Sequence, residues 1–367
     1  MIEPACKKTP LYDYYESLGY KAEQRNGSMD FYCFSSLNDE YDTLYNGVGL
    51  RDISTNAILV LTGNDVLDFL NRITTNSLKD LPSLSSVRTI FTTDKGRILD
   101  SVRVINFNSY KLIIGHKGCE QKLTGWINKY IINDDVKVQS ADGNYTVFEV
   151  AGPQCNSFMT LLCGRQVEQF VDNLAIQINV EGISAYVLKF RDVNQEVKYL
   201  IITNPAEGMR LIDFALSNKG AFQFGLIGND AYEVYRIEQG IPSGNELNDQ
   251  YNPHEVRLLS EVSFTKGCYI GQEVIARLKT YDKVQKYLNG IIIENADAKV
   301  TGLQLVDVNG NEAGKITSTV YSGFLKKQIG LAVINKDYNN ASAELFAVDT
   351  QSINKYKILV EDLPFRK

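Results

Sequence analysis

Apolar residues in the first part of the chain form strand-like runs and helix-like patterns that follow one another. Gly63 ends the first β-rich run, and Asn64 is suited to cap a helix whose apolar side chains recur at helical spacing. Two later runs enclose Thr93-Asp94-Lys95-Gly96, which has the Asp and Gly expected of a hairpin turn. The predicted elements are a strand at 57–62, a helix at 64–73, a hairpin at 88–105, a strand at 110–115 and a helix at 119–132. This order predicts an α+β sheet with helices on one face.

A second set of strands and helices follows, and the pattern then changes towards the C-terminus. Strands are predicted at 145–150 and 199–203, and helices after Gly152-Pro153, at 205–217 and at 229–240. After about residue 284, short β-like runs alternate with turns such as Asn309-Gly310, which is typical of a small all-β barrel or sandwich. These runs are 288–293, 303–307, 314–321, 329–333 and 344–348. We therefore expect two related α+β lobes, 1–143 and 144–283, and a β domain at 284–367.

The composition is that of an ordinary globular protein, and its charge argues against one class of partner. A chain of 367 residues is long enough for two or three domains with a large core. A net charge of −6 is unusual for a protein built mainly to hold nucleic acid, which needs a basic face. No apolar run approaches the roughly 18 residues of a membrane span, and residues 1–8 have the features of neither a signal nor a transit peptide. We expect a cytoplasmic protein that binds neither nucleic acid nor a membrane.

The cysteines and histidines limit disulfide and metal chemistry. No two cysteines form a Cys-x-x-Cys pair and all are scattered, so a disulfide framework is not expected. His116 and His254 are the only histidines, which excludes a histidine-rich metal site, and we expect no metal ligands. The cysteines are Cys6, Cys33, Cys119, Cys155, Cys163 and Cys268.

The sharpest motif is an octapeptide that places one thiol between a lysine and a predicted helix start, Lys266-Gly267-Cys268-Tyr269-Ile270-Gly271-Gln272-Glu273. Apolar residues at 274, 275 and 278 then recur at helical spacing. A thiol beside a lysine and ahead of a helix N-terminus should ionise more readily than a free cysteine, so Cys268 and Lys266 are candidate catalytic residues. The alternative is a turn between glycines with a buried, inert cysteine, which is the usual state of a free thiol.

The run at 265–280, TKGCYIGQEVIARLKT, resembles the signature of the YgfZ family of tetrahydrofolate-binding proteins. That family shares its fold with the glycine-cleavage T-protein, an aminomethyltransferase. Three further segments are similar to T-proteins, namely TPLY at 9–12, GVGLRDIS at 47–54 and RIEQGIP at 236–242. The resemblance covers almost the whole chain. It implies a three-lobed α+β arrangement around a central folate channel, with a C-terminal β-barrel.

The same resemblance implies a function and a set of site residues. The cofactor would be tetrahydrofolate or another reduced folate, and the role would be assembly or repair of iron–sulfur clusters. The protein partners would be iron–sulfur client proteins or assembly factors. Cys268 would act there as a nucleophile, a redox group or a transient ligand to iron. One cysteine cannot hold a cluster, so no stably bound cluster is expected. The implied folate-binding residues are Glu196, which matches the family's pterin-binding glutamate, and Arg236, Tyr269, Gln272, Glu273 and Arg277.

Two positions depart from the T-protein pattern and weaken the aminomethyltransferase interpretation. The family's pair of aspartates is represented by Asp100 and Ser101, and a serine cannot supply a carboxylate at neutral pH. Neighbouring strand residues face opposite sides, so Asp100 remains a candidate catalytic carboxylate only if the backbone shifts. Its alternative role is a strand-edge carboxylate in solvent or beside an arginine. Tyr232 replaces a basic residue, which leaves Arg236, Arg277 and Lys279 as candidates for contacting the folate glutamate tail.

Three functions therefore remain open from the sequence. The first is the tetrahydrofolate-binding protein that supports iron–sulfur enzymes through Cys268. The second is a folate-dependent one-carbon transferase, such as an aminomethyltransferase, which needs a folate site and a carboxylate but not Cys268. The third is a non-catalytic scaffold that contacts partners through its β-rich C-terminal domain.

Overall fold

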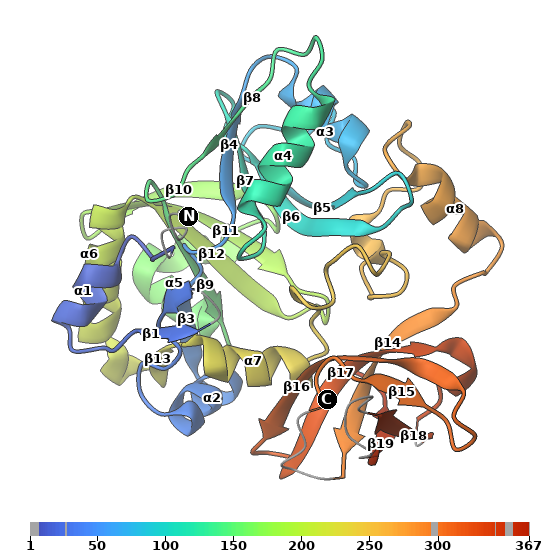
Figure 1. The fold of residues 1–367 in the computed structure, drawn as a ribbon. Helices are drawn as coiled ribbons and strands as arrows, with labels where there is room; N and C mark the ends of the chain where they lie inside the picture. Colours follow the sequence, from blue (N-terminus) through green and yellow to red (C-terminus); the bar gives the residue numbers. More distant parts are fainter. Residues whose placement is uncertain (1–6, 26–27, 295–299, 342, 349–354, 367) are drawn as a thin grey trace, which may run out of the picture. The chain divides into compact units, whose positions relative to one another are not determined.

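The computed structural model describes residues 7–25, 28–294, 300–341, 343–348 and 355–366, and the chain forms two compact units (Figure 1). The first unit comprises the chain up to Phe69 together with Leu78–Arg88 and Val102–Tyr232. The second comprises Leu70–Ser77, Thr89–Ser101 and the chain from Glu233 onwards. The second unit therefore combines two short, neighbouring stretches of the N-terminal part of the chain with the distant C-terminal part.

A six-stranded sheet with the order β10-β11-β12-β9-β3-β13 forms the centre of the first unit. Neighbouring strands are antiparallel, except that β3 and β13 are parallel to each other. Side chains alternate between the two faces along each strand, so Phe148 and Ile201 lie in one core and Val147 and Leu200 in another. The bounds are β3 Val48–Asp52, β9 Thr146–Ala151, β10 Ala175–Val180, β11 Ile183–Arg191, β12 Val197–Thr203 and β13 Phe224–Leu226.

Helices pack on the Phe148 face of this sheet. Their buried residues, among them Tyr15, Phe158 and Leu211, join the strands in one apolar core. Helix α6 begins as the sequence predicts, because the side chain of Asn204 accepts a hydrogen bond from the backbone of Glu207 and proline occupies the first turn. The helices of this unit near the six-stranded sheet are α1 Tyr12–Ser17, α2 Leu37–Asn46, α5 Cys155–Cys163, η1 Gly164–Gln169, α6 Pro205–Ser217 and η2 Lys219–Ala221.

A five-stranded sheet with the order β5-β6-β7-β4-β8 follows the predicted elements of the first set. Ile58, Ile105 and Leu112 from its strands share a core with the Leu200 face of the six-stranded sheet. The bounds are β4 Ile58–Thr62, α3 Val66–Ile73, β5 Ser86–Thr92, β6 Ile98–Asn106, β7 Lys111–Ile114, α4 Glu120–Tyr130 and β8 Lys137–Ser140, and a separate short hairpin pairs β1 Glu23–Arg25 with β2 Ser28–Asp30. Helix α3 and strands β5 and β6 each continue into the second unit.

The second unit contains a closed barrel with the strand order β14-β17-β16-β15-β18-β19, drawn in orange to red in Figure 1. Closure leaves no free strand edge, and the interior is filled by apolar side chains such as Ile291, Ile316 and Leu345. The bounds are β14 Lys286–Ile293, β15 Gln304–Val306, β16 Glu312–Ser322, β17 Lys327–Asn335, η4 Lys336–Tyr338, β18 Glu344–Val348 and β19 Lys355–Glu361. Before the barrel, the described chain forms α7 Asn229–Glu238, whose first residues belong to the first unit, η3 Leu259–Glu261 and α8 Gln272–Thr280.

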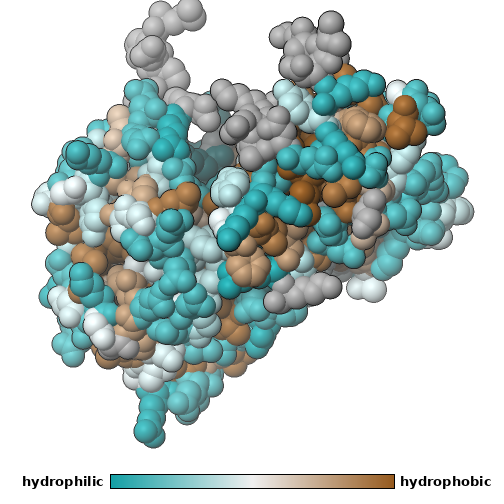
Figure 2. Space-filling model, turned by 90° about the horizontal axis from the view of Figure 1, so that it is seen from below, coloured by the Kyte–Doolittle hydropathy of each residue, from teal (hydrophilic) through white to brown (hydrophobic). Residues whose placement is uncertain are grey.

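The predicted α+β class and the C-terminal β-barrel are confirmed, and the choice between barrel and sandwich falls to the closed barrel. The division into lobes at 1–143, 144–283 and 284–367 stays a prediction. No helix in the described part of the chain is long and apolar enough to cross a membrane. On the face drawn in Figure 2, hydrophilic residues in teal are interspersed with hydrophobic residues in brown.

Candidate functional site

The loop at 265–271, which we call the motif loop, is anchored in the second unit by the side chain of Lys266. The Nζ atom donates hydrogen bonds to the backbone oxygens of Asn71 at 2.6 Å, Thr74 at 2.8 Å and Asn76 at 2.6 Å. Helix α3 ends at Ile73, and the last backbone oxygens of a helix have no partner within it. The C-terminal end of a helix also attracts positive charge. Lys266 therefore caps the end of α3 from almost 200 residues further along the chain.

Backbone groups hold the motif loop on its other side. Ile270 donates from its N–H to the backbone oxygen of Arg72 at 3.1 Å, and its own carbonyl accepts from Thr92 Oγ1 at 2.7 Å. Gly271 has a φ of +84°, and an added Cβ would lie 2.5 Å from the backbone oxygen of Thr93. Only glycine fits this combination of backbone angle and close approach. The loop is thus fixed against both α3 and the hairpin turn that follows β5.

Cys268 is exposed, whereas Cys119, Cys155 and Cys163 are buried and Cys33 is half-buried. Burial raises the pKa of Cys33 and Cys155 to about 11 and that of Cys163 to about 12. Cys6 lies outside the described residues. The motif cysteine is therefore not buried, Cys268 is the exposed thiol among the described cysteines, and its reactivity stays a prediction.

The ammonium of Lys266 donates its hydrogen bonds to the segment at 71–76, whereas the sequence predicted that its charge would act on the Cys268 thiol. An ammonium has three N–H donors, and the three backbone oxygens of the 71–76 segment occupy all of them. Burial lowers the pKa of Lys266 to about 7, while the three acceptors favour the charged form. Lys266 is first an anchor of the motif loop, and a direct effect of its charge on the Cys268 thiol stays a prediction.

The remaining motif residues lie on the loop and on the first turns of α8, which begins at Gln272 as predicted. Tyr269 is buried, and burial raises its pKa to about 12. Gln272 is half-buried, whereas Glu273 and Arg277 are exposed. These four side chains share one short segment of the second unit, and their role in holding folate stays a prediction.

Asp100 and Ser101 lie near the start of β6 and are both buried. Asp100 has no exposed surface, so the alternative role of a solvated strand-edge carboxylate is wrong. Ser101 donates from its hydroxyl to Glu261 Oε2 at 2.5 Å, and Glu261 is itself buried. A carboxylate therefore lies beside position 101 although the sequence has serine there. Sequence reasoning missed Glu261 because 160 residues separate it from its partner.

Arg236 is buried within an ion-pair network of the second unit. Its guanidinium pairs with Glu233 and contacts Glu246 Oε2 at 3.3 Å, the hydroxyl of Ser318 at 2.8 Å and the backbone oxygen of Ile241 at 3.3 Å. Glu246 has no exposed surface and also accepts from Ser318 at 2.7 Å. These contacts indicate that Arg236 joins α7 to the barrel, and its implied role in folate binding stays a prediction.

Glu196 belongs to the first unit and is exposed in the turn between β11 and β12. Its backbone N–H donates to Asp192 Oδ1 at 3.1 Å, and Asp192 Oδ2 lies 3.2 Å from Lys198 Nζ. Lys198 and Asp192 are only 2% and 8% exposed, so the buried charges are beside Glu196 and not on it. Glu196 is therefore not a buried carboxylate of the kind that forms the strongest charge-assisted hydrogen bonds, and its role in folate binding stays a prediction.

Tyr232, at the position where the T-protein resemblance implies a basic residue, lies under a guanidinium. The Cζ atom of Arg51 is 3.6 Å from the centre of the Tyr232 ring. Arg51 of β3 lies directly opposite Glu149 of the antiparallel strand β9. The sequence prediction named Arg236, Arg277 and Lys279 as substitutes and missed Arg51. Arg51 lies in the segment at 47–54 that is similar to T-proteins, and no local signal in the sequence indicates its contact with Tyr232.

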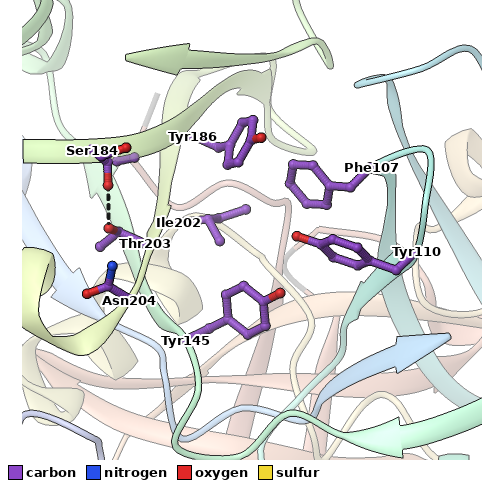
Figure 3. Close-up of a pocket in the computed structure, with 9 residues that line it drawn as sticks. Phe107, Tyr110, Tyr145, Ser184, Tyr186, Ile202, Thr203 and Asn204 are labelled. Atoms are coloured by element: carbon purple, nitrogen blue, oxygen red, sulfur yellow. Dashed lines mark hydrogen bonds between the residues drawn. The ribbon is translucent and has the colours of Figure 1, made fainter. Parts of the chain in front are cut away.

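A small cavity of about 180 Å³ is also present in the first unit (Figure 3). The rings of Phe107, Tyr110, Tyr145 and Tyr186 surround Ile202 there. Burial, with a further contribution from the hydroxyl of Tyr145, raises the pKa of Tyr110 well above its usual value. Among the residues that the structure describes, no group of three or more His, Cys, Asp or Glu side chains is placed to hold a metal ion.

Comparison with known proteins identifies two matching family models. Residues 8–266 match the GCVT N-terminal domain, and residues 286–367 match the glycine cleavage T-protein C-terminal barrel domain. An aminomethyltransferase of Staphylococcus carnosus (strain TM300) is 26% identical over 335 residues, which cover 90% of this chain and 91% of the relative. A putative chloroplastic transferase of Arabidopsis thaliana is 28% identical over 315 residues, which cover 83% of this chain and 69% of the relative.

A solved structure gives the same result for the fold. The crystal structure of the glycine cleavage system aminomethyltransferase T from Bartonella henselae matches with a TM-score of 0.82 and covers 98% of both chains. Its sequence is 18% identical, so this likeness concerns the fold alone.

Proposed function

The chain belongs to the glycine cleavage T-protein family, and within it we propose a tetrahydrofolate-binding protein of the YgfZ type. Its role is to support assembly or repair of iron–sulfur clusters in client enzymes. The observation that carries the proposal is an exposed cysteine on a rigidly anchored loop, flanked by the octapeptide that resembles the YgfZ signature. An aminomethyltransferase mechanism needs a carboxylate at the folate and has no use for such a thiol.

The chemistry assigned to Cys268 follows from its exposure. A thiolate at the surface is able to attack an electrophilic sulfur, to be oxidised reversibly or to ligate iron that is being delivered to a client. A cluster needs several thiolates, so one cysteine acts on a cluster only in transit. The anchored loop holds the thiol in one place while leaving it accessible to a macromolecular client.

A reduced folate is the proposed cofactor, and one feature of the first unit fits it. Arg51 Nε and Glu149 Oε1 are buried polar atoms without hydrogen-bond partners. Such atoms are rare in folded proteins and favour a polar ligand that completes them. A bound reduced folate would supply a carrier for one-carbon groups. Glu196, Tyr269, Gln272, Glu273 and Arg277 remain predicted contacts.

The first prediction tests the role of the thiol. Cells that lack this protein should show reduced activity of iron–sulfur enzymes, which the wild-type gene restores and a Cys268→Ala gene restores poorly, by less than about a tenth of the wild-type effect. Cys119→Ala is the matched control, because Cys119 is buried and distant in sequence from the motif. Equal restoration by wild type and Cys268→Ala would remove the thiol from the mechanism.

An aminomethyltransferase is the second candidate, favoured by the name of the Staphylococcus relative. We predict that purified protein gives no glycine-cleavage turnover with an aminomethylated lipoyl carrier and tetrahydrofolate. The reason is Ser101, which stands where the resemblance implies an aspartate, and robust wild-type turnover would promote the second candidate.

A carboxylate at position 101 has to be introduced together with a second change. Ser101→Asp alone would place its carboxylate against that of Glu261, and two like charges in a buried site repel strongly. The double variant Ser101→Asp, Glu261→Gln keeps one carboxylate and one hydrogen-bond donor. Turnover gained by this variant would show that the rest of the site is competent for one-carbon transfer.

A further inference from the structure

Charged side chains occupy one face of three neighbouring strands in the first unit. Arg51 of β3 lies directly opposite Glu149 of β9 in an antiparallel register, so the two side chains are on the same face and close together. Glu149 is in turn opposite Leu200 of β12, and Lys198 lies two residues before Leu200 on that same face. Apolar side chains fill most of this sheet, so the charges form a defined polar site.

The charge of Lys198 is neutralised by Asp192, which directly follows β11. Lys198 Nζ is 3.2 Å from Asp192 Oδ2, and the two side chains are almost fully buried. A buried pair of this kind is stable only while both partners remain. Arg51 and Glu149 each have a buried atom without a hydrogen-bond partner. Arg51 Nε donates no hydrogen bond, and Glu149 Oε1 accepts none. Leaving each such atom without a partner is unfavourable.

An aromatic ring forms one wall of the site. The guanidinium of Arg51 stacks on Tyr232 at 3.6 Å, and Lys198 Nζ is 5.9 Å from the centre of the same ring. Burial raises the pKa of Tyr232, and the charge of Glu149 raises it further, which places Glu149 near the phenol as well. The site therefore combines one unused N–H donor and one unused carboxylate oxygen with an aromatic ring that packs against the guanidinium.

We propose that Arg51 and Glu149 recognise the polar edge of the pterin ring of a reduced folate, beside the ring of Tyr232. That edge carries a carbonyl oxygen next to a ring N–H and an exocyclic amino group. Arg51 donates to the carbonyl oxygen, and Glu149 accepts from the N–H and the amino group. Hydrogen bonds with two charged partners are short and strong, and their parallel arrangement discriminates against rings with another donor pattern.

The inference rests on the proposed folate binding and changes the assignment of the recognising carboxylate. Glu196, which the resemblance implies, is exposed, whereas Glu149 Oε1 is buried. A buried carboxylate loses its water and gains more from a ligand that donates to it. The pterin edge therefore selects Glu149, and Glu196 contributes little to the affinity.

Calorimetry under anaerobic conditions on the full-length protein tests the inference with three probes. These are tetrahydrofolate, 6,7-dimethyltetrahydropterin, which has the ring alone, and 4-aminobenzoylglutamate, which lacks it. We expect Glu149→Gln and Arg51→Gln each to raise the Kd of tetrahydrofolate and of the pterin by roughly 10- to 100-fold, with no change for 4-aminobenzoylglutamate. The matched controls are Glu168→Gln and Arg191→Gln, which alter exposed residues of the same unit.

The outcomes separate this inference from the proposed function. Wild-type affinity for tetrahydrofolate in both Glu149→Gln and Arg51→Gln would overturn the inference and leave the function standing. A loss confined to Glu196→Gln would also overturn it, because the pterin edge would then lie at the exposed turn. Absence of wild-type binding to any reduced folate would overturn both. Arg51→Lys, which keeps the charge and loses Nε, should still weaken pterin binding, and thermal unfolding of each variant confirms that it is folded.

Discussion

Replacing Arg236 by methionine is expected to lower the free energy of unfolding of the second unit by about 3–5 kcal/mol. The substitution leaves Glu246 with its charge and no exposed surface, and takes one hydrogen bond from Ser318. An unpaired buried carboxylate is far less stable than a paired one. Because Ser318 is in β16, the change should reach the barrel.

Hydrogen exchange followed by mass spectrometry measures this effect where it arises. Peptides from 233–246 and from β16 should exchange faster in Arg236→Met, whereas peptides from β9 and β12 of the first unit should not change. The double variant Arg236→Met, Glu246→Leu removes both charges and should recover much of the loss. Arg191→Met, which breaks an exposed pair with Asp172, should alter stability by less than about 1 kcal/mol.

The same variant decides between two roles of Arg236. If the residue joins α7 to the barrel, affinity for tetrahydrofolate falls only as far as the folded fraction falls. A large loss of folate affinity at unchanged stability would instead support the contact that the family resemblance implies.

Much of the fold was predictable because several segments carry strong local signals. Helix α6 has its cap at Asn204 and a proline in its first turn, and the observed bounds match the prediction. The hairpin of β5 and β6 follows from its Asp and Gly turn, with Gly96 at a φ of +67°. Five barrel strands were predicted from short β-like runs, but β19, which pairs with the preceding strand β18 and with the distant strand β14, was not.

The site was less predictable because its contacts join segments far apart in sequence. Lys266 was assigned to its sequence neighbour Cys268, whereas its ammonium bonds to the end of α3. The serine at position 101 was interpreted as the loss of a carboxylate, whereas the carboxylate of Glu261 lies beside it. Local sequence shows that a residue is charged, but the partner of that charge is set by packing of distant segments.

Replacing Lys266 by methionine is expected to lower the free energy of unfolding of the second unit by about 2–4 kcal/mol. Methionine has a similar length but no donor, so the backbone oxygens of Asn71, Thr74 and Asn76 each lose a hydrogen bond. Chemical denaturation and exchange of peptides from 70–77 and 263–271 measure the loss. Lys283→Met, which alters an exposed lysine just after α8, is the matched control and should change little.

The destabilisation by Lys266→Met should depend on pH with a definite sign. Burial lowers the pKa of Lys266 from 10.5 to about 7, so between these values the unfolded wild-type chain binds this proton more tightly than the folded one. The contribution of Lys266 to the free energy of unfolding therefore increases as the pH rises from about 7 towards 10. Methionine has no such proton, so the difference between wild type and variant should be larger at pH 9 than at pH 6. A difference that shrinks with pH would show that the folded state holds the ammonium more tightly than the unfolded one.

Alkylation of Cys268 then distinguishes an anchor from a charge that acts on the thiol. In wild type, iodoacetamide should modify Cys268 faster than Cys33, Cys119, Cys155 or Cys163, because only Cys268 among them is exposed. Lys266→Met frees the motif loop from α3. It removes no hydrogen bond to the sulfur of Cys268, because the three donors of the ammonium are all used by backbone oxygens. Alkylation in the variant should therefore be as fast as in wild type, with faster exchange of the loop. A clear slowing at unchanged exchange would mean that the charge of Lys266 supports the thiolate directly, as the sequence alone predicts.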